Sequence, residues 1–209
     1  MRQTTLACAT ALSILASTWL ATGSTAGAVE VEKGLTASLI TEQVIADARQ
    51  FLANPLVAMS VKMQNEKRRG FTQQEIEALD EVWRAERKTA RKPLIAATMS
   101  SPLSTYLTRV QARSIGLYSE IFVMDAYGLN VGQSSITSDY WQGDEGKWQK
   151  TFLIGPEAIF VDEAEWHEDT RTWRAQLNMT VNDPDTGKPI GAVTIELNLT
   201  ELQRRAFKR

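Results

Sequence analysis

Residues 137–148 place three carboxylates among three large aromatic rings. The stretch reads TSDYWQGDEGKW, and its acids and rings are, in chain order, Asp139, Tyr140, Trp141, Asp144, Glu145 and Trp148. Carboxylates in such a setting serve as catalysts, as metal ligands, as receptors for a cation, or as turn and capping residues. The other residues of the chain help to separate these four roles.

Catalysis needs partners that the rest of the chain does not supply. A hydrolase triad needs a nucleophile, a base and an orienting group, yet His167 is the single histidine and lies in EAEWHEDT, which reads as an exposed polar turn. The chain has no G-x-S-x-G motif and neither of the glycine-rich phosphate loops. A glycosidase needs two carboxylates across a sugar cleft, and any acidic aromatic loop resembles that in sequence. We therefore expect no enzyme, with a carboxylate-based hydrolase as the weakest alternative.

Metal binding is equally poorly matched. The spacing of Asp139, Asp144 and Glu145 does not fit an EF-hand, which takes alternate oxygen ligands over 12 residues and ends in glutamate. An irregular calcium site is left as a weak alternative. Cys8 is the only cysteine, so no pair of thiolates is available for a metal or a disulfide. We expect no metal and no cofactor.

Binding of a small molecule suits the stretch better. A carboxylate beside flat rings attracts an ammonium group through charge and cation–π interactions. A carboxylate ligand stays open as well, because three cations lie in or near the stretch: Lys147, Arg171 and Arg174. Asp139 has a second interpretation as the cap of a helix beginning at Tyr140. Asp144 and Glu145 are more simply explained as solvent-facing residues, and Trp148 as part of the core.

Helices are predicted for the first half of the chain. Apolar residues at helical spacing indicate a long helix over residues 35–65, which Pro55 kinks or splits. Thr72 and Glu75 form a capping-box pattern that begins a second helix. A third helical stretch is expected near 94–114, interrupted around Ser100–Pro102.

The second half favours an antiparallel sheet of about five strands, preceding a short C-terminal helix in LTELQRRAF. The alternating patterns are YSEIFVMD, the return after DAYGLNV, residues 158–163, TWRAQLNMTV and IGAVTIELNL. Asp125 and Asp185 fit hairpin turns without any ligand. Helices followed by an antiparallel sheet define an α+β fold class.

The N-terminus is typical of an export signal. Residues 6–23 carry no charge, Arg2 supplies a basic start, and Ala26-Gly27-Ala28 fits a cleavage site. We predict a secretion signal at 1–28 and one domain at 29–209, with periplasmic localisation; an uncleaved membrane anchor is the alternative. Cleavage removes one of 23 basic residues and none of the 25 acidic ones, so we expect no nucleic-acid binding.

These residues together resemble the single-Cache sensor family, the extracytoplasmic relatives of PAS domains. The resemblance is carried by EIFVMDAYGLNVGQSSITSDYWQGDEGKWQ and by the final hairpin TVNDPDTGKPIGAVTIEL, and it covers about residues 35–202. It implies a long N-terminal helix packed on a PAS-like sheet, and sensing rather than catalysis. It also implies a small-molecule pocket built by Tyr118, Thr137, Asp139, Tyr140, Trp141, Gln142 and Trp148, which Gln176 or Asn178 would help to close.

The sequence differs from typical members of that family after Leu202. Such sensors sit between two membrane helices and pass a signal to a kinase or chemotaxis module, whereas no second apolar segment follows here. We expect a ligand-binding protein that docks on a membrane-bound kinase or receptor, with a homodimer through the long helix as a further possibility. The competing hypothesis is an interaction or scaffold protein of the same fold whose pocket is filled.

Overall fold

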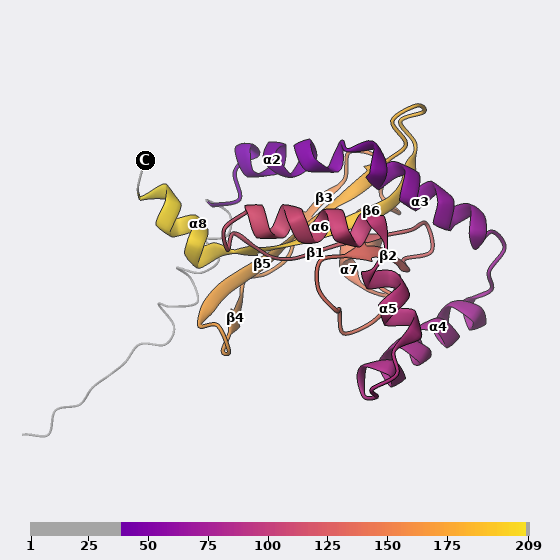
Figure 1. The fold of residues 1–209 in the computed structure, drawn as a ribbon. Helices are drawn as coiled ribbons and strands as arrows, with labels where there is room; N and C mark the ends of the chain where they lie inside the picture. The colour runs from indigo at the N-terminus through magenta and orange to yellow at the C-terminus, as the bar shows by residue number, and fades with distance from the viewer. Residues whose placement is uncertain (1–38, 208–209) are drawn as a thin grey trace, which may run out of the picture.

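The computed structural model describes residues 39–207, in which helices pack on both sides of an antiparallel sheet (Figure 1). The predicted export signal at 1–28 and the first residues of the predicted long helix lie outside this range. None of the described helices is both long and apolar enough to span a bilayer. The α+β class predicted from the sequence is confirmed.

Seven helices are described. Their bounds are α2 (Glu42–Leu52), α3 (Pro55–Lys67), α4 (Gln73–Arg87), α5 (Pro93–Met99), α6 (Pro102–Arg113), α7 (Gly146–Gln149) and α8 (Leu199–Ala206). Pro55 splits the long helix into α2 and α3 because proline has no N–H and its ring clashes with the preceding turn. Asn54 restarts the helix by accepting a hydrogen bond from the Leu56 backbone at 3.0 Å.

The later helices begin where the sequence indicates. Thr72 and Glu75 form a complete capping box at the start of α4. Ser101 caps α6 by accepting from the Ser104 backbone at 3.1 Å, so the predicted third helical stretch is interrupted between α5 and α6. Asn198 caps the C-terminal helix α8 in the same way.

Six strands form one sheet in the order β2-β1-β6-β5-β3, with β4 paired to the start of β5. Their bounds are β1 (Tyr118–Met124), β2 (Asn130–Gln133), β3 (Ile159–Val161), β4 (Glu165–His167), β5 (Thr172–Asn182) and β6 (Pro189–Asn198). The prediction that His167 lies in a polar turn is corrected by the structure. Glu165–His167 form a short strand that pairs with Thr172–Arg174. Weak alternation in EAEWHEDT concealed this strand.

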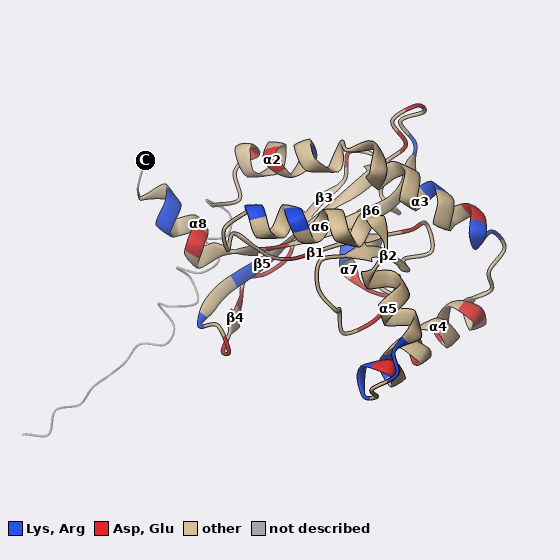
Figure 2. Cartoon of the chain, viewed as in Figure 1, with Lys and Arg blue, Asp and Glu red and all other residues tan. Residues whose placement is uncertain are grey.

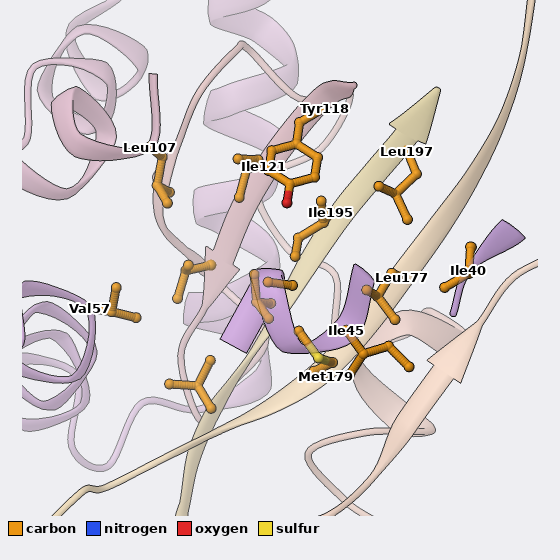
Figure 3. Close-up of a cluster of buried hydrophobic side chains, with 14 of the residues drawn as sticks. Ile40, Ile45, Val57, Leu107, Tyr118, Ile121, Leu177, Met179, Ile195 and Leu197 are labelled. Atoms are coloured by element: carbon orange, nitrogen blue, oxygen red, sulfur yellow. The ribbon is translucent and has the colours of Figure 1, made fainter. Parts of the chain in front are cut away.

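One face of the sheet carries the main core. Ile121, Leu177 and Ile195 point into it together with Ile45 from α2, Val57 from α3 and Leu107 from α6 (Figure 3). These side chains are almost completely removed from water. Apolar burial is the largest favourable contribution to folding, so this face holds α2, α3 and α6 in place.

The opposite face is more polar and lies beneath α7. Cross-strand neighbours share a face, so the register of β1, β6 and β5 places two rows on this side, Glu120–Glu196–Gln176 and Phe122–Thr194–Asn178. Phe122 and Met124 form a small apolar cluster here, against which Trp148 and Phe152 pack. Polar groups on the inner side of a covered sheet are costly unless they have a partner.

Candidate ligand-binding site

The predicted aromatic segment 137–142 is packed against α4. The ring of Tyr140 stacks on Trp83 with centroids 5.0 Å apart, and the side chain is only 2% exposed. Its hydroxyl accepts a hydrogen bond of 2.6 Å from Arg68 at the end of α3. Trp83 in turn donates to the Thr137 carbonyl at 3.1 Å. Tyr140 therefore joins α3, α4 and the segment.

Asp139 is held by a cation of the same chain. The Arg84 Nε donates to its carboxylate at 2.8 Å. The predicted helix at Tyr140 is wrong, because Trp141 forms a β-bridge with Leu129 and the next helix begins only at Gly146. The backbone N–H groups of Tyr140 and Trp141 instead donate to Asp80 of α4, at 2.8 and 3.1 Å.

A buried polar network lies behind Asp139. Thr137 donates to the Asp139 carbonyl at 2.7 Å, and Gln142 donates to the same carbonyl at 3.0 Å. Asn130 of β2 donates to the Thr137 hydroxyl at 3.0 Å. Both Asn130 and Gln133 keep one buried amide atom without a protein partner, which is the usual position of an internal water.

The remaining predicted residues occupy two separate places. Trp141 donates to the Tyr127 carbonyl at 2.9 Å, and Trp148 donates to the Asp125 carbonyl at 3.2 Å. Tyr118 lies on the other face of the sheet, tilted against Phe51, and its burial raises the pKa of the phenol. The structure thus groups six predicted residues on or near one loop and separates Tyr118 from them. Ligand contact by any of the seven stays a prediction.

Asp125 has the structural role that the turn pattern indicates. The carboxylate is fully buried and accepts from the backbone N–H groups of Tyr127 and Leu129, each at 2.9 Å. Gln64 of α3 and Arg68, which follows directly after α3, donate to its other oxygen at 2.8 and 3.4 Å. Desolvation raises the pKa of Asp125, and these hydrogen bonds oppose the rise. Nothing in the sequence indicated that Gln64 and Arg68 contact Asp125, except that they are polar residues one helical turn apart.

A recess of about 270 Å³ opens between α7, β4, β5 and β6. Its lining consists of Glu145, Lys147, Asp162, Glu163, Glu165, Arg174, Ala175, Gln176 and Glu196. Figure 2 shows acidic segments of β4 beside the basic start of β5. Larger hollows flank α3 and are lined mainly by apolar surface, whereas charged side chains converge on this recess.

The two cations of the recess already have partners in the chain. Lys147 forms an ion pair with Glu145 at 2.8 Å and donates to Gln142 at 3.3 Å. Arg174 pairs with Glu196 at 2.7 Å. Lys147 also lies 5.5 Å above the ring of Phe122. The recess therefore connects with the predicted loop through Gln142.

Glu120 lies beside this recess and is not among the site residues predicted from the sequence. It is the cross-strand neighbour of Glu196 and accepts a hydrogen bond of 2.6 Å from Ser135. Burial raises the pKa of its carboxyl, and the neighbouring Glu196 raises it further. Within residues 39–207 it forms no ion pair. The sequence feature that could have indicated this site is a glutamate within the otherwise apolar strand pattern YSEIFVMD.

Comparison with known proteins gives a resemblance of fold at low identity. No protein-family description matches the chain, and no curated protein matches it. Among solved structures, the sensory domain of the Campylobacter jejuni chemoreceptor Tlp3 is 11% identical with a TM-score of 0.39, over 86% of this chain and 64% of that one. The extracellular domain of the putative histidine kinase rpHK1S-Z16 is 12% identical with a TM-score of 0.41, over 88% and 63%.

A third similar structure is the ligand-binding domain of the Pseudomonas aeruginosa PAO1 amino acid chemoreceptor PctC, determined with GABA. It is 14% identical with a TM-score of 0.36, over 63% of this chain and 55% of that one. The chain thus spans 55–64% of the length of these three structures. They are sensory portions of receptors and kinases, the class that the sequence resembles.

Proposed function

We propose that this chain is an exported sensory module that takes a small polar molecule into the recess below α7. The observation that carries the proposal is the convergence of charged side chains on one hollow over an otherwise covered sheet face. Buried or half-buried charges are costly, and natural sequences keep them mainly where they bind or react. The export signal predicted at 1–28 supports a periplasmic site of action.

The recess suits a small ligand. Its volume of about 270 Å³ is roughly that of nine water molecules, at about 30 Å³ each in the liquid. Such a space accommodates a small organic molecule. Phe122 and Phe160 contact Lys147 and Lys150 of the α7 segment through cation–π geometry, so the wall beside the recess combines charge with apolar surface.

The predicted loop supplies a route from the recess to the helices. Lys147 donates to Gln142, Gln142 donates to the Asp139 carbonyl, and the Asp139 carboxylate pairs with Arg84 of α4. A ligand that displaces Lys147 breaks the first contact of this chain. We propose that α4 thereby reports occupancy to a membrane-bound receptor or kinase. In this proposal Asp139 and Gln142 transmit the signal.

A thermal-shift panel of amines, amino acids and short carboxylates tests the proposal. We expect at least one class to stabilise the protein and the variant Gln176→Trp, which fills the recess, to abolish that shift. Ile159→Trp is the matched control, because it adds the same ring at a hollow beside α3. The proposal fails if no compound raises the melting temperature, or if Gln176→Trp responds like the unchanged protein.

A second candidate role is self-association through α3. Met59 and Met63 are 55% and 68% exposed on this helix, and exposed apolar side chains in a row favour a contact surface. Sedimentation of the protein and of a Met59→Lys/Met63→Lys variant tests this role. A dimer that the double variant dissociates supports it, and a monomer at all concentrations contradicts it.

A further inference from the structure

The charges of the recess are unevenly matched. Five carboxylates and two cations line it, and both cations are engaged in ion pairs inside the chain. An incoming carboxylate would have to displace Glu145 or Glu196 from its partner and would meet the remaining acids. An incoming cation shares Glu196 with Arg174, but the excess of carboxylates over cations in the lining favours a positively charged ligand.

Glu120 adds a further carboxylate at the inner side of this recess. It stands directly opposite Glu196 across β1 and β6, and Cβ atoms of such pairs are about 4.5–5.5 Å apart. Its hydrogen-bond donor is the neutral Ser135 hydroxyl at 2.6 Å, and Lys147 and Arg174 act on it only through longer-range attraction. A half-buried carboxylate that no cation contacts directly is destabilising, so a bound cation would supply the direct ion pair that Glu120 lacks.

We infer that the ligand of this recess is a small organic cation with a primary ammonium group, and that Glu120 selects for its positive charge. This inference rests on the proposed function of the recess. The ammonium group has three N–H donors, enough to reach Glu120 and Glu196 together. The ring of Phe122 is 2% exposed and lies under the Lys147 ammonium, so a ligand that displaces Lys147 would gain this ring as an apolar wall for its alkyl part. A cation at this position is therefore compatible with the ring.

Proton linkage follows from the surroundings of Glu120. The groups that face it are Ser135, Glu196 on β6, Lys147 on α7 and Arg174 on β5. Burial and Glu196 raise the pKa of Glu120, while Ser135, Lys147 and Arg174 lower it, with a net rise. Because the cation binds the ionised carboxylate, its affinity falls as the pH drops through the raised pKa, and binding releases protons.

Calorimetric titration of the whole chain with three probes of similar shape tests the inference: n-butylammonium, butyrate and butyramide. We expect n-butylammonium to bind at least tenfold more tightly than the anion or the neutral amide. Glu120→Gln should weaken n-butylammonium at least tenfold, and Glu120→Asp should weaken it less. The surface variant Asp144→Asn is the matched control and should bind within twofold of the unchanged protein. The affinity should fall as the pH drops towards the raised pKa of Glu120, and much less in Glu120→Gln.

The outcomes separate the inference from the proposed function. Preferential binding of butyrate or butyramide that Gln176→Trp abolishes overturns the cation inference and leaves the recess as the binding site. Unchanged affinity for n-butylammonium in a folded Glu120→Gln protein also overturns it. Absence of binding by all three probes, together with a silent thermal-shift panel, overturns both.

Discussion

Two regions of this molecule hold acids beside aromatic rings, and they differ in where those acids find partners. In the segment 137–142, Asp139 pairs with Arg84, and Tyr140 is bonded to Arg68 and stacked on Trp83. Beside the recess, Glu120 accepts a hydrogen bond from a neutral hydroxyl, and no cation contacts it directly within residues 39–207. The same residue types stabilise the fold where the chain supplies a contacting counter-charge, and we propose that they bind a ligand where it does not.

The largest effect is expected at Asp125, which anchors the first region. Asp125→Ala removes the carboxylate that accepts from two backbone N–H groups, from Gln64 and from the buried Arg68. Removing one partner of a buried charge pair costs about 3–5 kcal/mol. Urea denaturation should show a loss of this size, whereas exposed Asp144→Ala should change the free energy of unfolding by less than about 0.5 kcal/mol. If Asp125→Ala and Asp144→Ala changed the free energy of unfolding equally, the structural role proposed for the first region would be wrong.

A smaller loss is expected when only the hydroxyl of Tyr140 is removed. Tyr140→Phe keeps the stack on Trp83 but deprives Arg68 of an acceptor at 2.6 Å. The cost of such an unsatisfied buried donor is about 1–3 kcal/mol. Chemical denaturation measures it. A neutral result would show that water replaces the hydroxyl and that the segment is less closed than its contacts indicate.

A gain in stability, rather than a loss, is expected when Glu120 is replaced. Its raised pKa means that the folded state holds the proton more tightly than the unfolded chain, so ionised Glu120 destabilises the fold above that pKa. Glu120→Gln should raise the melting temperature at pH 7 by roughly 2–4 °C, equivalent to about 1 kcal/mol in a protein of this size. The gain should shrink as the pH falls towards 4.5. A destabilised variant at pH 7 would contradict the account of the second region.

The smallest effect on stability is expected at Asp139. Its partner Arg84 is 56% exposed, and such pairs contribute about 0–1 kcal/mol. Asp139→Asn should therefore lower stability by less than about 1 kcal/mol, with the difference vanishing in 1 M salt. A much larger or salt-independent loss would place Asp139 among the buried anchors.

The sequence predicted the local structure well because its signals are local. Thr72 and Glu75 mark a helix start, Pro55 marks a break, and alternation marks β5 and β6. Strand β4 was not predicted, because its three residues are too few to show an alternating pattern. The α+β architecture followed from the order of these elements.

The site was harder to predict because its partners are distant in the chain. Arg84 is 55 residues from Asp139, and nothing in either sequence segment pairs them. Glu120 and Glu196 meet only through the register of β1 and β6. Tyr118 was predicted to share a pocket with the loop residues, but its side chain lies in the main core on the other face of the sheet. A register shift between Tyr118 and Glu120 disturbs the alternation of side chains along β1.

The most direct test of the account is the position of a bound cation. Intermolecular nuclear Overhauser effects between n-butylammonium and the aromatic protons of the protein report which ring it contacts. The account predicts contacts from the methylene protons to Phe122, lost in Glu120→Gln and kept in Asp139→Asn. Contacts to Trp141 or Tyr140 that Asp139→Asn abolishes would contradict it and return the site to the segment 137–142.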